Sequence, residues 1–393
     1  MSGAPTATAV RTRIGGGIRP EIQALRALAV FAVVIGHVWP RVAPAGFLGV
    51  DVFFVISGFL ITGQLMRERE RTGRLDLLRF YLRRARRLLP AAVTALAATT
   101  LATLVVVPRD LWRQYLGEIL SSLFYVQNWF LAIASADADR AALDGSPVVH
   151  FWSLSVEEQF YFVWPLVVMI GFIAAARMGE RRGMLVVLST VTVASFGYSV
   201  LQTGVNSDFA YYSTLSRAWE FGIGGLLALL PRTAGGLSDR QRAVLSWLGI
   251  VLIVGSVVAW TDKGAFPGWT AIVPVLGAAA VIHAGAPDAK WGPLPLARTR
   301  LVQWFGDASY SLYLWHWPII ALLPFATGVP TPWYVLVPLL GLCVAVSALS
   351  LRFIENPMRR TAIGDPSGRG LVVGYTALGL GTAAACTAGL VLA

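Results

Sequence analysis

The feature of this sequence that most constrains its fold is a series of long apolar runs, each about 17–23 residues in length. A helix of ~20 apolar residues spans the ~30 Å hydrocarbon core of a bilayer, so these runs predict transmembrane helices. Only 13% of the 393 residues are charged, and the runs leave no room for a separate soluble domain. The sequence therefore predicts an all-α, polytopic membrane helix bundle.

Eleven transmembrane helices are expected within one domain, residues 20–393. The predicted spans are 21–40, 47–66, 89–107, 155–176, 184–202, 213–230, 243–260, 269–284, 307–326, 333–353 and 370–392. A shorter segment, 117–133, is interrupted by Gln127 and Asn128 and is expected to be re-entrant or interfacial. Residues 1–19 are Gly-rich and basic with no apolar periodicity, which predicts a disordered cytoplasmic tail.

The distribution of Lys and Arg predicts the orientation of the bundle. With the N-terminus inside, the cytoplasmic segments hold 25 of the 32 Lys and Arg residues and the outer loops hold 5. Cytoplasmic loops of membrane proteins carry such an excess, so the C-terminus is expected outside. The same distribution explains the net charge of +11 better than a nucleic-acid partner does, because the basic residues separate apolar runs.

The two cysteines, Cys343 and Cys386, both lie in apolar runs. Neither a disulfide framework nor a cysteine metal site is expected from them, and no metal ligand set is predicted elsewhere. The GxGG sequence at 222–225 follows no strand, so close helix packing is favoured over a phosphate loop.

The first predicted helix carries two ionisable residues, Arg26 and His37, eleven residues apart. Eleven residues are close to three turns, which places both side chains on one face, ~16 Å apart along the axis. A charge inside a bilayer is costly, so such residues are functional candidates, although a structural arginine and a packed histidine are the alternatives. Asp51 opens the second helix near the depth of His37, where it would either orient His37 as a general base or cap the helix.

Two further groups of charged residues are candidates. Glu157 and Glu158 stand at the outer start of a predicted span, where one of them is expected to turn inward. On the cytoplasmic side, Arg83, Arg84 and Arg87 precede the third helix; they would bind phosphates or anchor the topology on anionic lipid.

Three other residues have a structural explanation at hand. Arg217 and Glu220 are one helical turn apart and are expected to pair with each other. His316 lies among aromatic residues in SLYLWHWPII, which favours a structural role.

These motifs, taken in order, resemble the acyltransferase-three family of bacterial membrane proteins from about residue 18 to residue 360. The resemblance is carried by the Arg26 to His37 spacing and by the stretches GFLGVDVFFVISGFLIT, YLRRARRLLP, FWSLSVEEQFYFVWP, SYSLYLWHWPII and RFIENPMRR. It implies a multipass protein of the bacterial plasma (inner) membrane that transfers an acyl group, acetyl being expected, from cytoplasmic acyl-CoA to a hydroxyl of an extracytoplasmic glycan or glycolipid.

The resemblance also implies the site residues. The family's first-helix Arg and His match Arg26 and His37, its acidic residue after Gly-Val matches Asp51, and its Arg-x-x-Arg motif matches Arg84 and Arg87. Its acidic position in SVEEQFY matches Glu157 or Glu158, with Glu157 favoured. Acyl-CoA is expected as a co-substrate and no cofactor is expected to be bound permanently. Many members carry a C-terminal SGNH esterase-like domain, which is expected to be absent here, truncated, or replaced by a partner protein.

The expected mechanism places the CoA phosphates on the arginine cluster and uses His37 to remove the proton of the acceptor hydroxyl. A transporter or flippase that uses the buried Arg, His and Glu residues as a substrate or proton path is the alternative, and a non-catalytic scaffold is a weaker one. No internal repeat of the kind that many transporters contain is visible.

Overall fold

The computed structural model describes residues 13–14, 17–135, 145–230, 236–261, 265–329, 332–360 and 366–393. This part of the chain is helical apart from its loops and one short antiparallel pair, β1 (Arg13–Ile14) with β2 (Gly17–Ile18). Most of the tail expected to be disordered over residues 1–19 lies outside the described residues. The all-α class is confirmed.

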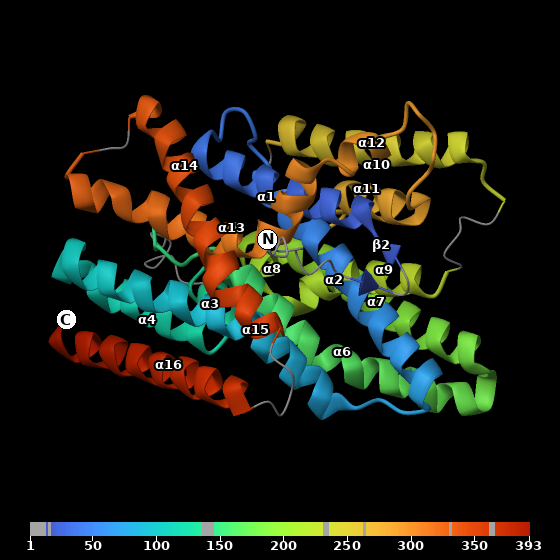
Figure 1. Ribbon diagram of the computed structural model, residues 1–393, viewed down its shortest axis with the longest axis horizontal. Helices are drawn as coiled ribbons and strands as arrows, with labels where there is room; N and C mark the ends of the chain where they lie inside the picture. The colour runs from blue at the N-terminus through green and yellow to red at the C-terminus, as the bar shows by residue number, and fades with distance from the viewer. Residues whose placement is uncertain are drawn as a thin grey trace, which may run out of the picture.

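The helices pack side by side into a single bundle (Figure 1). They are α1 (Pro20–Val38), α2 (Gly49–Thr72), α3 (Leu77–Val106), α4 (Trp112–Leu123), α5 (Gln127–Ala134), α6 (Phe151–Met178), α7 (Glu180–Val205), α8 (Ser207–Tyr212), α9 (Thr214–Ala228), α10 (Asp239–Ala259), α11 (Ile272–Ala284), α12 (Leu294–Ala297), α13 (Arg300–Thr327), α14 (Trp333–Ser350), α15 (Asn356–Arg360) and α16 (Pro366–Leu392). A π-helical turn, Leu351–Glu355, joins α14 to α15.

Within the described residues, eight helical segments are long and apolar enough to cross a bilayer. They contain α1, α2, α3, α6, α7, α10, α14 and α16. The other three expected spans correspond to α9, α11 and α13, with 15, 13 and 28 residues. These three pack inside the bundle, α9 on α2 and α7, α11 on α10, and α13 on α1. The multipass architecture is confirmed, whereas the count of eleven and the orientation stay predictions.

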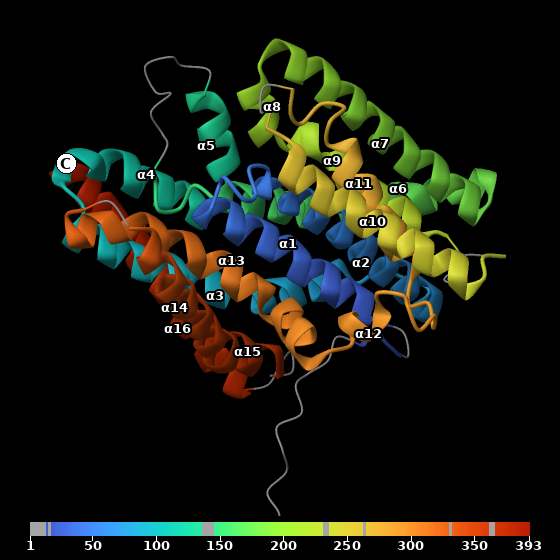
Figure 2. The same cartoon turned by 90° about the horizontal axis from the view of Figure 1, so that it is seen from above.

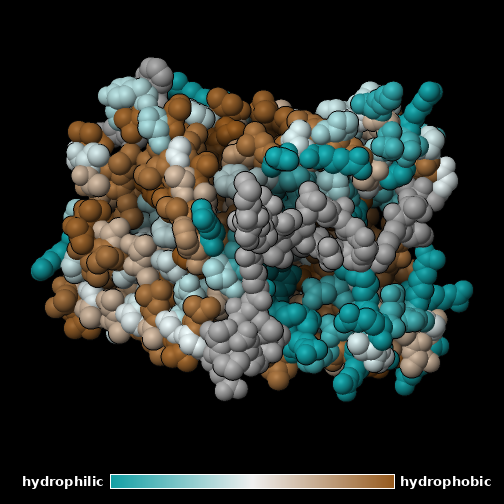
Figure 3. Space-filling model, in the orientation of Figure 1, coloured by the Kyte–Doolittle hydropathy of each residue, from teal (hydrophilic) through white to brown (hydrophobic). Residues whose placement is uncertain are grey.

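The surface separates by polarity along the long axis of the molecule. On the face shown in Figure 3, hydrophilic residues gather toward the right-hand end, near the connections between α2 and α3 and between α6 and α7. The helix ends that meet at those connections, within residues 67–87 and 177–182, carry much of the predicted cytoplasmic charge. The opposite half of this face is largely hydrophobic, as a surface in contact with lipid must be.

Helix α1 lies in the middle of the bundle, against α13 and α2 (Figure 2). Helix α2 in turn packs closely on α9 because glycines face each other's backbone. A Cβ atom at Gly58 would lie 1.9 Å from the Phe221 carbonyl oxygen, and one at Gly224 would lie 2.1 Å from that of Val55. The predicted role of the 222–225 glycines in close packing is therefore confirmed, and this contact fixes which charged residues of α9 meet α2.

The segment 117–133 is interrupted as predicted. Helix α4 ends at Leu123 and α5 begins at Gln127, with Tyr125 at a left-handed φ of 54° between them. Both polar residues of the break are buried: Gln127 donates to Glu118 at 2.9 Å and Asn128 donates to Thr214 at 3.0 Å. These bonds satisfy polar groups that would otherwise be costly in an apolar bundle.

Candidate active site

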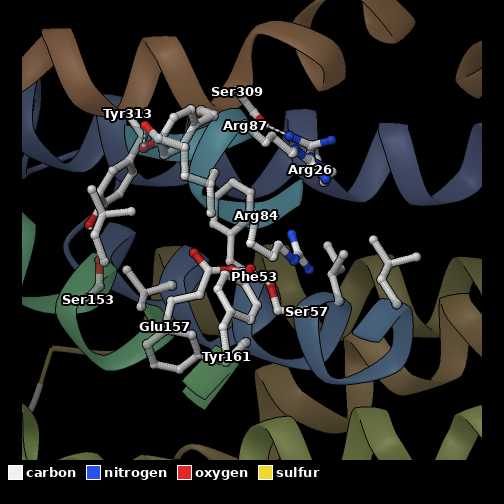
Figure 4. Close-up of a pocket in the computed structure, with 17 residues that line it drawn as sticks. Arg26, Phe53, Ser57, Arg84, Arg87, Ser153, Glu157, Tyr161, Ser309 and Tyr313 are labelled. Atoms are coloured by element: carbon white, nitrogen blue, oxygen red, sulfur yellow. Dashed lines mark hydrogen bonds between the residues drawn. The ribbon is translucent and has the colours of Figure 1, made fainter. Parts of the chain in front are cut away.

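One cavity lies between α1, α2, α3, α6 and α13 and opens partly to solvent; its empty space, with the open part included, is about 720 Å³. Its polar lining is Arg26, Ser57, Arg84, Arg87, Ser153, Glu157, Tyr161, Ser309, Tyr310 and Tyr313. Its apolar lining is Val50, Phe53, Phe54, Ile56, Leu60, Leu88 and Leu154. Figure 4 shows Arg26 and Arg87 at one side and Ser153 and Tyr313 at the opposite side. The cavity is therefore cationic at one end and neutral at the other.

Arg26 is held in place by the neighbouring helix. Its Nη2 donates to Ser309 Oγ at 2.9 Å and its Nη1 donates to Gln23 Oε1 at 3.2 Å, while Gln23 donates to Asp307 at 2.5 Å. Both direct partners of Arg26 are uncharged, and the described residues place no carboxylate within 4.0 Å of its guanidinium. Its positive charge is therefore oriented but not neutralised, which suits an anionic ligand.

The arginine cluster of α3 divides between two faces of the helix. Arg84 and Arg87 are three residues apart, share a face and line the cavity. The guanidinium of Arg84 lies over the Tyr161 ring, 4.1 Å from its centroid. Arg83 points elsewhere, because its Nη2 pairs with Glu68 at 3.1 Å. Neighbouring helical positions lie ~100° apart, so Arg83 is not among the described residues that line the cavity, and its place in the phosphate-binding group stays a prediction.

The two candidate glutamates differ in whether they line the cavity. Glu157 lines it and its Oε1 accepts hydrogen bonds from the hydroxyls of Ser57 and Tyr161. Glu158 is not among the described residues that line the cavity. The lining thus includes the favoured Glu157, while its catalytic role stays a prediction.

His37 lies beyond the neutral end of the cavity, in a cluster of histidines. Its Nδ1 is 3.1 Å from Nε2 of His316, and its ring packs on Trp317 with centroids 4.5 Å apart. The ring of Tyr313, which lines the cavity, packs on His316 at 5.5 Å. His37 is therefore not among the described residues that line the cavity, but His316 and Tyr313 connect it to the cavity wall.

Asp51 was expected to orient His37, and the partner that the structure gives it is Arg217. It is fully buried, and its Oδ2 lies 3.1 Å from Nη2 of Arg217; neither of its oxygens accepts a hydrogen bond within the described chain. Arg217 also pairs with Glu220 at 3.2 Å, which confirms the predicted pair. Arg217 thus has two carboxylate partners, Asp51 and Glu220. The close contact of α2 with α9 brings Arg217 to Asp51, and an ion pair in a buried setting displaces the weaker carboxylate–imidazole contact.

The sequence reasoning missed an acidic and basic pair next to the cavity. Glu355 is buried, accepts a bond from Ser311, and pairs with Arg359 at 2.6 Å. Arg359 is close enough to Arg26 and Arg87 that their positive charges interact. The i,i+4 spacing of Glu355 and Arg359 in RFIENPMRR was the available signal. Within the described residues, no three His, Cys, Asp or Glu side chains form a potential metal site.

The fold and the cavity define the class of this protein. It is a multipass membrane protein with an arginine-rich cavity, and a cluster of histidines lies beyond the neutral end of that cavity. The family model described as an acyltransferase domain matches residues 19–352. The chain therefore belongs to the acyltransferase-three family.

The chain is also similar to individual proteins whose names describe them as O-acetyltransferases. The chain is 33% identical over 356 residues to the putative peptidoglycan O-acetyltransferase YrhL of Bacillus subtilis (strain 168), with 86% of this chain and 55% of that protein covered. It is 32% identical to the O-acetyltransferase OatA of Staphylococcus aureus (strain NCTC 8325 / PS 47), with 87% and 57% covered. It is 29% identical to the peptidoglycan O-acetyltransferase OatA of Listeria monocytogenes (serovar 1/2a, strain ATCC BAA-679 / EGD-e), with 89% and 57% covered. The chain thus spans just over half the length of these relatives. No solved structure matches it.

Proposed function

We propose that this protein is an O-acyltransferase of the bacterial inner membrane that transfers an acetyl group from cytoplasmic acetyl-CoA to a hydroxyl of an extracytoplasmic glycan of the peptidoglycan type. The observation that supports it most is the cavity, which is lined by three arginines, by one glutamate and by neutral and apolar side chains. The relatives' names supply the acetyl group and the peptidoglycan acceptor.

The arginines suit the anionic end of the donor. Arg84 and Arg87 would bind the phosphates through the planar, two-pronged geometry of the guanidinium. Arg26, held by Ser309 and Gln23 and lying on the same side of the cavity as Arg87, would contact the same end of the donor. Glu157 has a supporting role, because it binds the hydroxyl of Tyr161, on whose ring Arg84 lies.

The apolar wall suits the rest of the donor. Phe53, Phe54 and Leu60 line the cavity, so the uncharged arm of acyl-CoA would pack on such side chains and extend toward the Tyr313 end. That direction leads toward the histidine cluster, because Tyr313 packs on His316 and His316 contacts His37. The acyl end of a donor bound by its phosphates would thus approach the side of the membrane predicted to face outward.

In the proposed reaction the acceptor hydroxyl loses its proton to His37 as its oxygen attacks the thioester carbonyl. The carbon–sulfur bond breaks, and the CoA thiolate leaves and takes up a proton, so the products are an ester and free CoA. His37 is partly exposed, which suits an acceptor that arrives from outside. Transfer through an SGNH domain or partner protein is the alternative route from the membrane domain to the glycan.

The test uses the full chain, purified and reconstituted in liposomes. Acetyl-CoA and peptidoglycan fragments are added together and separately, and free CoA and acetylated fragments are measured by mass spectrometry. Direct transfer predicts that both products appear in equal amounts and only when both substrates are present. A relay predicts CoA release with acetylated glycan only after an SGNH protein is added. Transport of acceptor without release of CoA would support the flippase alternative and refute the enzyme.

A further inference from the structure

Three of the four histidines in the sequence meet at the neutral end of the cavity. His316 is fully buried and His150 is 2% exposed, whereas His37 is partly exposed. His316 stands between the other two: its Nε2 is 3.1 Å from Nδ1 of His37, and its ring centroid is 5.5 Å from that of His150.

The backbone of α13 determines where the protons of these rings lie. His316 Nδ1 is 3.0 Å from the Leu312 carbonyl oxygen, which can only accept, so this nitrogen carries the proton. In a neutral ring Nε2 of His316 then holds a lone pair and accepts the Nδ1–H of His37. His37 therefore carries its proton on Nδ1, which makes its Nε2 the basic nitrogen.

His150 is held by a different backbone group of the same helix. Pro318 has no N–H, so the Leu314 carbonyl four residues earlier loses its usual helical partner. His150 Nε2 donates to that carbonyl at 3.3 Å. One buried histidine of the cluster thus satisfies a helix interruption, and the other acts on His37.

We propose that His316 is a positioning residue of the reaction, which selects the Nδ1–H tautomer of His37 and turns the Nε2 of that ring toward the acceptor hydroxyl. This proposal rests on the proposed function, in which His37 is the base. His316 takes the place that the sequence assigned to Asp51, because Asp51 is committed to Arg217. His316 touches no substrate and acts through His37.

The protons balance with His316 neutral throughout. The acceptor proton moves to Nε2 of His37, which becomes a cation that still donates its Nδ1–H to His316, and the proton returns to the departing thiolate. His316 does not receive it, because its Nδ1 is already protonated and burial disfavours a second charged ring.

Three variants separate this role from simple packing. His316→Gln places an amide oxygen where Nε2 stood, so it can still accept the hydrogen bond that His37 Nδ1–H donates. His316→Phe fills the same volume but has no hydrogen-bond acceptor. His150→Gln is the matched control, since it keeps a donor for the Leu314 carbonyl and leaves both partners of the His37–His316 hydrogen bond in place. Each is reconstituted, and kcat and the KM for acetyl-CoA are measured with peptidoglycan fragments, with thermal unfolding as the check on folding.

The expected result is a loss in kcat of about 100-fold or more for His316→Phe with KM within about 3-fold, the scale of a displaced general base. His316→Gln should stay within about 10-fold of wild type, and His150→Gln within about 3-fold. A folded His316→Phe protein with kcat near wild type overturns the proposal, as does a His316→Gln protein as inactive as His316→Phe. If His37→Gln is inactive while His316→Phe is normal, only this inference fails; if the wild type releases no CoA, the proposed function fails with it.

A second measurement needs no turnover. With four histidines in the chain, ¹⁵N-histidine labelling gives a spectrum that single His→Gln variants can assign. The proposal predicts that His37 carries its proton on Nδ1 in the wild type and redistributes it toward Nε2 in His316→Phe. An Nε2–H tautomer of His37 in the wild type would refute the assignment.

Discussion

Removal of single arginines from α3 tests the donor site most sharply, because the helix presents a matched control. Arg84 and Arg87 line the cavity, whereas Arg83, next to Arg84 in the sequence, pairs with Glu68. Each substitution by alanine removes one positive charge from the same turn of the same helix. A topology anchor would respond to all three alike, but a phosphate site would respond only to Arg84 and Arg87.

The magnitude follows from the hydrogen bonds lost. A hydrogen bond to a charged group contributes about 1.5–3 kcal/mol, and about 1.4 kcal/mol corresponds to a tenfold change in affinity. Loss of Arg84 or Arg87 should therefore weaken acetyl-CoA binding by roughly 10- to 150-fold. Arg83→Ala removes only a partly exposed ion pair, worth ~0–1 kcal/mol of stability, and should leave donor binding unchanged.

The assay is titration of the reconstituted protein with CoA and with 3′-dephospho-CoA, with thermal unfolding recorded for each variant. Lysine at positions 84 and 87 should restore part of the affinity, because it keeps the charge but lacks the planar fork. Equal losses for Arg83→Ala and Arg84→Ala, or normal affinity in the Arg84→Ala/Arg87→Ala double variant, would refute the reasoning and leave the cluster as a topology signal.

Three further predictions follow from the rest of the bundle. His37→Gln should fold normally and lose about 10²–10⁴-fold in turnover, so activity within ~10-fold of wild type would exclude a general base there. Arg217→Ala should destabilise the protein by roughly 3–5 kcal/mol in thermal or denaturant unfolding, because it leaves the carboxylates of Asp51 and Glu220 buried without a cation. Asp51→Asn should destabilise the protein much less and keep turnover, since Arg217 and Glu220 still pair. A cysteine at position 71 should resist impermeant thiol reagents on intact cells, and rapid labelling there would invert the predicted orientation.

The helical period predicted the site better than it predicted the contacts within it. Residues on one face of one helix were found together: Arg84 with Arg87, and Arg217 with Glu220. Arg26 was recognised because a charge in an apolar run needs an explanation, and it does line the cavity. These inferences depend only on spacing and on the cost of a buried charge, which the sequence contains.

Contacts between helices far apart in the sequence were beyond the same reasoning. Asp51 was paired with His37 because the two are near in the chain, but the glycines at 58 and 224 bring Arg217 against Asp51 instead. Likewise His316 was given a packing role, since nothing in SLYLWHWPII reveals that α13 lies against α1. Backbone separations of this kind are set by close packing, which no single helix encodes.

The pairing of the buried charges also bears on the choice between an enzyme and a proton-driven carrier. A proton path needs carboxylates or histidines that can exchange protons in succession across the bilayer. Here Asp51 and Glu220 are both bound to one arginine, and Glu157 accepts bonds from Ser57 and Tyr161. Among the described residues that line the cavity, the charges are mainly cationic, with Arg26, Arg84 and Arg87 against the carboxylate of Glu157. Such a cavity attracts an anion and repels the hydronium or ammonium ions of a cation pathway, so its electrostatics favour a phosphate-bearing donor over a proton relay.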